Sequence, residues 1–184
     1  MKEALLILDM LNDFVQKGAP LEVPDARKII PAVQREIARV RAAGNPVIYV
    51  CDAHAPDDKE FFKFGWPAHA VKGTKGAKII DELKPVEGDI VIAKTTYSGF
   101  FGTSLDKTLK RLGVESLRLT GDVMHICVLF TASDAVLRDY MVTVVEDGCA
   151  GLSREDYDAA LRIMRNVLGV EVDNSGAEAG WKAA

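Results

Sequence analysis

The 184-residue sequence has no excess of positive charge, no long apolar run and few cysteines. Its 23 Lys and Arg residues are outnumbered by 27 Asp and Glu residues, a net charge of −4, so its charge does not favour binding to a nucleic-acid backbone. No apolar run approaches the ~20 residues of a membrane span. The opening Met1-Lys2-Glu3 leads into a short apolar run that ends at Asp9, unlike a secretory signal. We therefore expect neither a nucleic acid nor a membrane as a partner.

Only three cysteines are present, Cys51, Cys127 and Cys149, and none forms a CxxC pair. An odd number without metal-ligand spacing does not indicate a disulfide framework, which predicts a reducing, cytoplasmic location. Hydrophobic residues make up 48% and charged residues 27%, a composition typical of a folded domain. No linker divides the chain, so we expect one domain over 1–172 and a flexible C-terminal tail over 173–184.

Short apolar runs rich in Val, Ile and Leu recur along the chain. They are continuous rather than alternating, as expected for strands covered on both faces. The runs predict strands over 4–8, 46–51, 90–93, 117–120 and 141–145, with a weaker one over 169–172.

Segments with apolar residues at helical spacing separate these runs, and their ends are marked by proline, glycine or serine. One helix is predicted to have Pro31 at its first position and to stop before Gly44. Another is closed by Gly113, and a third begins after Ser153 and ends at Gly169. Strands alternating with helices predict an α/β fold, a single-domain three-layer α/β/α sandwich with a mostly parallel, roughly six-stranded sheet.

Chemically active residues follow several of the predicted strands. Asp9 ends the first, Asp52 the second and Lys94 the third, while Cys127 follows the fourth. Because the carboxyl ends of parallel strands lie along one edge of a sheet, where ligands bind, we expect these four groups in one cleft.

Cys127 stands where a helix is predicted to begin. The positive end of the helix dipole, helped by Lys94, is expected to lower the thiol pKa, and Asp9 could then take and return the proton. The alternative is that a free cysteine is usually buried and inert. For Cys51 and Cys149 we favour the inert reading, and for Cys127 both readings stay open.

A second group of residues is Asp52-Ala53-His54 with His69 downstream. One carboxylate and two imidazoles can bind a divalent metal and leave positions open for water or substrate. The alternative is that these histidines are ordinary surface or core residues.

Three segments together resemble the isochorismatase-like superfamily of cysteine hydrolases, and among them most closely the nicotinamidases. They are Leu8–Phe14, Lys94–Phe100 and Gly121–Ala132, in the family's order and spacing. The resemblance covers residues 2–172 and implies a Rossmann-like sandwich with Asp9, Lys94 and Cys127 as catalytic residues. The Asp52-x-His54 pair and the segment 66–74 resemble the nicotinamidase metal segment, which implies Asp52, His54 and His69 as metal ligands.

The resemblance also implies finer features of the site. The backbone N–H groups of Val123 and Cys127 would form the oxyanion hole, next to a cis peptide bond between Asp122 and Val123. Phe14 and Trp66 would flank a substrate ring, with Tyr97 nearby, although for any one of these aromatic residues taken alone core packing is the favoured reading.

Two departures from the family are visible. Val123-Met124-His125 replaces the usual small-Thr-Asp of the nucleophile loop, and a further histidine of the metal segment is missing, so that Glu60 or water would complete the metal shell. The resemblance implies a metal-assisted amidohydrolase, a nicotinamidase that uses a divalent metal, Zn with Mn or Fe as alternatives. It also implies a small-molecule amide as substrate and a homo-oligomer. An amidase for another carbamoyl or ureido substrate and a non-catalytic binding or redox-sensing protein remain as alternatives.

Overall fold

A computed structural model of the chain describes residues 1–175. Its centre is a six-stranded sheet in which every neighbouring pair of strands is parallel, in the order β3-β2-β1-β4-β5-β6. The strands are β1 (Glu3–Leu8), β2 (Val47–Asp52), β3 (Ile90–Lys94), β4 (Ser116–Asp122), β5 (Met141–Ala150) and β6 (Glu171–Asp173). All six predicted strands are confirmed. The strand order reverses between β1 and β4, which is where an open parallel sheet forms its ligand site.

The sheet is covered on both faces, as the continuous apolar runs predicted. In β1, Leu5 and Ile7 belong to one apolar cluster, whereas Ala4, Leu6 and Leu8 belong to the other, and all five side chains are fully buried. Successive side chains of a strand point to opposite faces of the sheet. When both faces are buried, every position is apolar and the apolar run is continuous.

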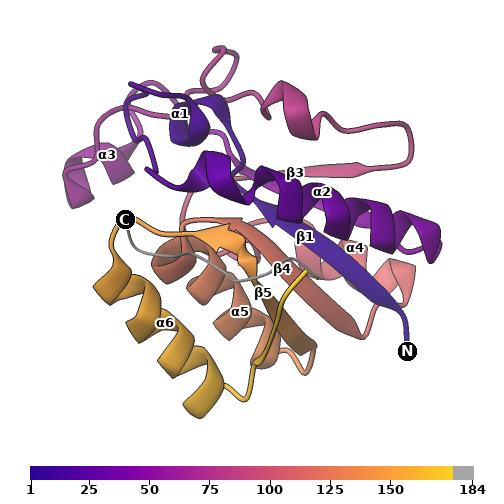
Figure 1. Cartoon of the computed structure of the whole chain (residues 1–184). Helices are drawn as coiled ribbons and strands as arrows, with labels where there is room; N and C mark the ends of the chain where they lie inside the picture. Colours follow the sequence, from indigo (N-terminus) through magenta and orange to yellow (C-terminus); the bar gives the residue numbers. More distant parts are fainter. Residues whose placement is uncertain (176–184) are drawn as a thin grey trace.

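The long helix α2 (Ala26–Ala42) covers one face, and α4 (Leu105–Leu112), α5 (Leu129–Val136) and α6 (Arg154–Asn166) cover the other (Figure 1). The predicted α/β/α sandwich is therefore confirmed. Two predicted helix ends are confirmed. Gly113, with a left-handed φ of 67°, is the C-cap of α4. Ser153 is the N-cap of α6, and its side chain accepts a hydrogen bond from the N–H of Asp156 at 3.1 Å.

The predicted start of α2 is wrong. The helix begins at Ala26, and Pro31 lies inside it rather than at its first position. Ala26 and Ile29 are buried, so the apolar face of the helix continues upstream of the proline and keeps this part on the core. Because Pro31 has no N–H, the carbonyl of Arg27 lacks its usual helical donor. Helix α6 also stops earlier than expected, at Asn166 instead of next to Gly169.

Several short elements surround the carboxyl end of the sheet. They are α1 (Asn12–Val15), α3 (Lys59–Phe64), a 3₁₀ turn (Asp81–Leu83) and a π-helical turn (Met124–Val128). At the chain end, Ser175 donates its N–H to Asp147 at 2.7 Å, and the remaining residues of the predicted tail, 176–184, lie outside the described residues. The boundary between domain and tail stays a prediction.

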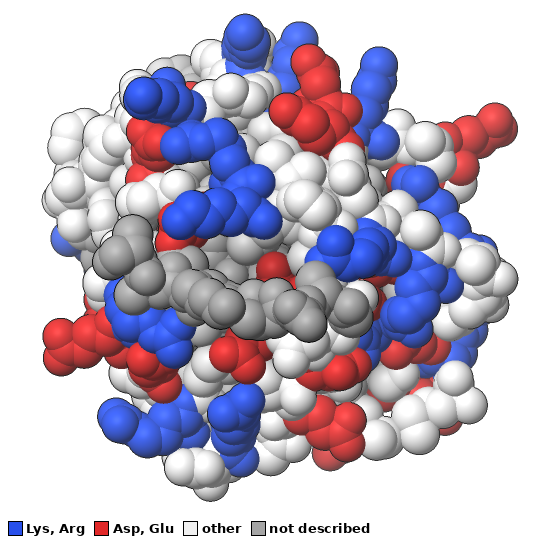
Figure 2. Space-filling view, viewed as in Figure 1, with Lys and Arg blue, Asp and Glu red and all other residues white. Residues whose placement is uncertain are grey.

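The surface charge agrees with the near-balanced composition. On the face drawn in Figure 2, Lys and Arg side chains are interspersed with Asp and Glu, so this face presents no field of one sign to a polyanion. None of the helices within residues 1–175 is long and apolar enough to cross a membrane.

Candidate active site

The ends of three neighbouring strands place three charged side chains together. Asp9 follows β1 with a left-handed φ of 51°, a conformation uncommon outside glycine that often marks functional residues. Asp52 is the last residue of β2 and Lys94 the last of β3, and the two are register partners in the sheet. Cys127 comes from the π-helical turn after β4. The predicted gathering of these four groups is therefore observed.

The ammonium of Lys94 is the centre of this group. Its Nζ lies 2.8 Å from Oδ2 of Asp9, 2.5 Å from Oδ1 of Asp52 and 3.5 Å from Sγ of Cys127. A carboxylate oxygen of Asp9 and Sγ of Cys127 lie within 4.8 Å of each other. We call Asp9, Lys94 and Cys127, the residues that the resemblance implies as catalytic, the catalytic cluster. Its members are separated by up to 118 positions of sequence and are all at least 95% buried.

The expected lowering of the Cys127 pKa is wrong. Burial raises the pKa of this thiol well above its ordinary value, and the charge of Asp9 raises it further, while Lys94 opposes both. Cys127 lies within the π-helical turn rather than at the start of α5, and the single ammonium is shared with two carboxylates. Burial and the charge of Asp9 therefore favour the neutral thiol over the thiolate in the resting site.

The charged neighbours of the thiol have perturbed pKa values as well. Burial, together with the charge of Asp52, raises the pKa of Asp9 to about 6, although Lys94 acts in the opposite direction. Burial also disfavours ionised Asp52, but Lys94 and His54 outweigh it and hold its pKa below the ordinary value. Asp9 is thus a base poised near neutral pH, as proton transfer requires.

The three predicted metal ligands also meet. Asp52, His54 and His69, which we call the metal-site cluster, offer ligand atoms that all lie within 4.8 Å of one another, and all three residues are buried. Oδ2 of Asp52 lies 3.6 Å from Nε2 of His54 and 3.8 Å from Nε2 of His69. Glu60 does not belong to this group, so among the described residues the structure does not support it as a further ligand.

The hydrogen bonds of the two imidazoles fit a metal. Nδ1 of His69 donates to the carbonyl of Pro67 at 2.8 Å, which leaves Nε2 with its lone pair free. Nδ1 of His54 is 3.0 Å from Oδ2 of Asp58, and its buried Nε2, 3.6 Å from Oδ2 of Asp52, has no hydrogen-bond partner among residues 1–175. A carboxylate behind a histidine is the usual support of a metal ligand, and two nitrogens with one oxygen suit Zn²⁺.

A small apolar cavity lies against these groups. Phe14, Trp66 and Tyr97 line it together with Val123 and Cys127, so the predicted ring-flanking residues and the predicted oxyanion residues share one space. Nε1 of Trp66 donates to the hydroxyl of Tyr97 at 3.3 Å. We call this the inner cavity. Its volume of 20 Å³ holds about one water molecule, so a substrate ring must displace the surrounding side chains to enter.

The loop Val123-Met124-His125, which departs from the family pattern, packs against the hydrophobic core through Met124. The peptide bond between Asp122 and Val123 is cis, as the resemblance implies. Met124 is fully buried in the apolar cluster beneath α5, and His125 packs close to Gly151. Burial lowers the pKa of His125, so the ring is neutral at this position. The apolar cluster therefore holds Met124 at a position where the resemblance implies Thr.

Two supporting carboxylates were not predicted from the sequence. Asp58 positions His54, and Asp13 accepts the backbone N–H of Ala70 at 2.8 Å, next to His69. Asp13 belongs to the Leu8–Phe14 segment, where its motif position could have indicated it. Asp58 lies in a polar loop without any distinguishing pattern.

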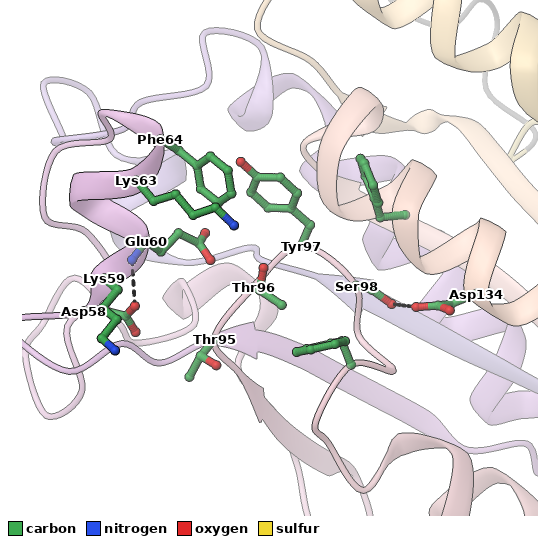
Figure 3. Close-up of a pocket in the computed structure, with 12 residues that line it drawn as sticks. Asp58, Lys59, Glu60, Lys63, Phe64, Thr95, Thr96, Tyr97, Ser98 and Asp134 are labelled. Atoms are coloured by element: carbon green, nitrogen blue, oxygen red, sulfur yellow. Dashed lines mark hydrogen bonds between the residues drawn. The ribbon is translucent and has the colours of Figure 1, made fainter.

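A second, larger cavity adjoins the first. It has a volume of 480 Å³ and lies between α3, residues 95–98 and α5, with Phe64, Phe101 and Phe130 among its walls (Figure 3). Glu60 and Tyr97 line both cavities, so these two side chains stand between them. We call it the outer cavity.

A parallel sheet whose strand ends surround a buried thiol with an acid and an ammonium is an α/β fold with a candidate cysteine-dependent active site at the carboxyl end of its sheet. The chain belongs to the isochorismatase family, because the Isochorismatase domain matches residues 3–174. Among solved structures, N-carbamoylsarcosine amidase from Thermoplasma acidophilum is 39% identical, with a TM-score of 0.86 over 98% of this chain and 100% of that one.

Two further relatives bear on the site. Pyrazinamidase of Pyrococcus horikoshii, solved in complex with zinc, is 32% identical, with a TM-score of 0.89 over 95% of this chain and 99% of that one. The Arabidopsis thaliana protein At3g16190, named a probable inactive nicotinamidase, is 35% identical over 173 residues, 89% of this chain and 88% of its own length. The family thus includes more than one amide substrate.

Proposed function

We propose that the chain is a metal-assisted cysteine amidohydrolase that converts nicotinamide and water to nicotinate and ammonia through a thioester on Cys127. The observation that carries the proposal is the contact between the catalytic cluster and an apolar cavity that also touches Asp52 and His69 of the metal-site cluster. The flat, neutral substrate matches the aromatic lining of the inner cavity.

The first half-reaction forms the thioester. Asp9 takes the proton of the Cys127 thiol as Sγ attacks the amide carbon, because the raised thiol pKa disfavours a free thiolate beforehand. The N–H groups of Val123 and Cys127 stabilise the oxyanion, and Lys94 balances the charge near sulfur. Asp9 then gives its proton to the amide nitrogen, the C–N bond breaks, and ammonia leaves.

The second half-reaction releases the acid. Asp9, ionised again, takes a proton from water as the water oxygen attacks the thioester carbon. The C–S bond breaks, Asp9 returns the proton to the sulfur, and the acid gives its own proton to solvent and leaves as nicotinate. A base with a pKa of about 6 can both accept and return a proton near neutral pH.

The metal-site cluster would hold a divalent cation, with zinc as the first choice. When bound, the cation would supply a positive contact for the pyridine nitrogen. Asp58 holds the ring of His54, and the carbonyl of Pro67 holds the ring of His69. Both imidazoles are therefore oriented by the chain itself.

Ammonia release from nicotinamide tests the proposal. We expect turnover by the purified protein and none by Cys127→Ala, with unchanged circular dichroism. Cys149→Ala is the matched control, because Cys149 is a buried thiol that does not line the inner cavity. Turnover by Cys127→Ala at the level of the wild type would refute the thioester.

A second candidate is an amidase for another carbamoyl or ureido substrate. The 39% identity to N-carbamoylsarcosine amidase favours it. Metal content separates the two: stoichiometric metal that is lost in His54→Ala and His69→Ala supports nicotinamide. A metal-free enzyme that stays active with chelator supports the second candidate.

A protein without catalysis is the third candidate, and the name of At3g16190 as probably inactive favours it. Absence of ammonia from a panel of amides, with rapid oxidation of Cys127 by peroxide, would indicate a binding or redox-sensing role. A homo-oligomer and a cytoplasmic location stay predictions, and light scattering of the purified protein tests the first.

A further inference from the structure

The segment that follows β1 is joined by hydrogen bonds to the loop that carries His69. The side-chain amide of Asn12 donates to the carbonyl of Lys75 at 2.9 Å and to the carbonyl of Lys78 at 3.1 Å. The backbone N–H of Asn12 also donates to the carbonyl of Lys78, at 3.0 Å. These bonds hold the loop against α1, and the side chain of Asp13 reaches further, to the residue next to His69.

Asp13 makes two hydrogen bonds with this loop. Its Oδ2 accepts the N–H of Ala70 at 2.8 Å, and its own N–H donates to the carbonyl of Gly76 at 3.1 Å. Ala70 is fully buried and has a left-handed φ of 45°, a conformation that a non-glycine residue keeps only where its surroundings hold it. Asp13 therefore fixes the strained residue that directly follows His69.

Ala70 also connects Asp13 to the other imidazole of the metal-site cluster. Its carbonyl accepts the N–H of His54 at 3.0 Å, and the carbonyl of His54 accepts the N–H of Lys72 at 2.9 Å, so residues 54 and 71 pair as in a parallel sheet. One series of hydrogen bonds thus begins at the carboxylate of Asp13 and ends at a predicted metal ligand. Because His69 directly precedes Ala70, this series also fixes the place of the second imidazole, whose ring centroid lies 4.9 Å from that of His54.

Gly76 leaves room for the carboxylate of Asp13. A Cβ at this position would lie 2.1 Å from Oδ2 and 2.3 Å from Cγ of Asp13, so a larger residue must push the carboxylate away from the N–H of Ala70. The φ of Gly76 lies outside the left-handed region, so the backbone itself does not require glycine here. The side chain of Asp13 is therefore the reason that this position has to be a glycine.

We propose that Asp13 is a positioning residue of the metal-site cluster, which fixes the two imidazoles relative to each other, and that Gly76 makes room for its carboxylate. The inference rests on the proposed function, because it takes the metal-site cluster as the ligands of the cation. Asp13 lies outside that cluster and does not line the inner cavity, so it acts through the backbone of Ala70. Groups that orient metal ligands typically change metal affinity by about 10–100-fold when they are replaced.

Zinc binding to the chelator-treated protein, measured by calorimetry, tests the proposal. We expect Asp13→Ala to raise the Kd for zinc by about tenfold or more, because the N–H of Ala70 loses its acceptor. Asp13→Asn keeps an acceptor oxygen and should stay within about threefold of the wild type. A merely structural role of Asp13 would lower the melting temperature without this dependence of zinc affinity on the acceptor.

Gly76→Ala tests the same contact without removing a polar atom. It should weaken zinc binding as Asp13→Ala does, because the new methyl group displaces the carboxylate. When the two substitutions are combined, the methyl group takes the space of the lost carboxylate. The double variant should therefore bind zinc no more weakly than Asp13→Ala alone, as expected for two residues that act through one contact.

Amide hydrogen exchange supplies a readout that needs no metal. In the metal-free protein, the N–H groups of Ala70 and His54 should exchange about tenfold or more faster in Asp13→Ala than in the wild type. The amides of β5 should keep their rates, which distinguishes a local release from a loss of the fold. If the wild type binds no zinc, the metal site of the proposed function fails, and the exchange rates still decide whether Asp13 holds the loop.

Asp89→Ala is the control. Oδ2 of Asp89 also accepts a backbone N–H, that of Val86 at 2.9 Å, but Asp89 directly precedes β3 and so lies at the opposite end of the sheet from the metal-site cluster. Its zinc Kd should change by less than about twofold. An unchanged Kd in Asp13→Ala overturns the proposal. A loss in Asp13→Asn as large as in Asp13→Ala also overturns it, because charge and not the hydrogen bond would then be responsible.

Discussion

Replacing Lys94 with methionine removes the ammonium between Asp9 and Asp52 and keeps a side chain of similar length. In the wild type the side chain of Lys94 has no exposed surface, and its Nζ lies 2.8 Å and 2.5 Å from the two carboxylates. The variant leaves both carboxylates buried without their cation. Asp9 itself is fully buried, so bulk water does not solvate its carboxylate.

The expected cost follows from this burial. Removing one partner of a buried ion pair costs about 3–5 kcal/mol, because the other charge stays desolvated. At about 2–4 °C per kcal/mol for a protein of this size, the melting temperature should fall by roughly 6–20 °C. Lys110→Met is the matched control, since Nζ of Lys110 lies 2.7 Å from Oδ2 of Asp106 but its side chain is 67% exposed. That variant should lose less than about 1 kcal/mol.

The loss in Lys94→Met should depend on pH. Without the ammonium, burial and mutual repulsion place the pKa values of Asp9 and Asp52 in the folded protein above those in the unfolded chain. The folded state then binds more protons than the unfolded state, so its stability falls as the pH rises through this range. The difference in free energy of unfolding between the variant and the wild type should therefore be larger at pH 8 than at pH 5.

Calorimetry of the chelator-treated proteins at both pH values measures these differences, and ammonia release measures the loss of turnover. The reasoning is refuted if Lys94→Met melts within about 2 °C of the wild type at pH 8, as Lys110→Met is expected to do. The reasoning is also refuted if the difference in stability between Lys94→Met and the wild type is larger at pH 5 than at pH 8.

Three further predictions concern backbone, capping and thiol reactivity. Gly121→Ala should lower the free energy of unfolding, measured in urea, by about 4 kcal/mol or more, because φ is +111° and a Cβ would lie 2.0 Å from the carbonyl oxygen of Leu8. Gly113→Ala is the control: a Cβ there would have nothing within 4 Å, and the loss should be about 1–2 kcal/mol. Equal losses would contradict the steric argument. Ser153→Ala should cost about 1 kcal/mol by the same assay, since it removes the cap of α6, and an unchanged midpoint would show that the cap contributes nothing. In the metal-free protein at pH 7, iodoacetamide should alkylate Cys127 more slowly than free cysteine, because the raised pKa of the Cys127 thiol leaves less thiolate. Mass spectrometry locates the alkylated residue. Faster alkylation of Cys127 would mean a resting thiolate and favour the redox-sensing alternative.

Local sequence patterns were sufficient for the order of the six strands and of the helices that cover the sheet, but they did not predict the short helices α1 and α3. Continuous apolar runs identify strands covered on both faces, and Gly113 and Ser153 end or begin helices through bonds within a few residues. The start of α2 could not be read in this way. Pro31 is a good first residue of a helix, yet the burial of Ala26 and Ile29 against the sheet, which no local pattern contains, extends the helix past it.

The members of the site were also determined by the sequence, since residues that follow parallel strands must meet at one edge of the sheet. Asp9, Lys94 and Cys127 meet there, as do the predicted metal ligands. Only the tertiary structure decided their charge states and their surroundings. The thiol pKa rises instead of falling, and Glu60 borders two cavities instead of joining the metal ligands. Hydrogen bonds between backbones place the ends of neighbouring strands, and a sequence pattern that predicts a strand therefore also predicts where its end lies. The desolvation of a group and the shape of a cavity depend instead on every side chain that packs around them.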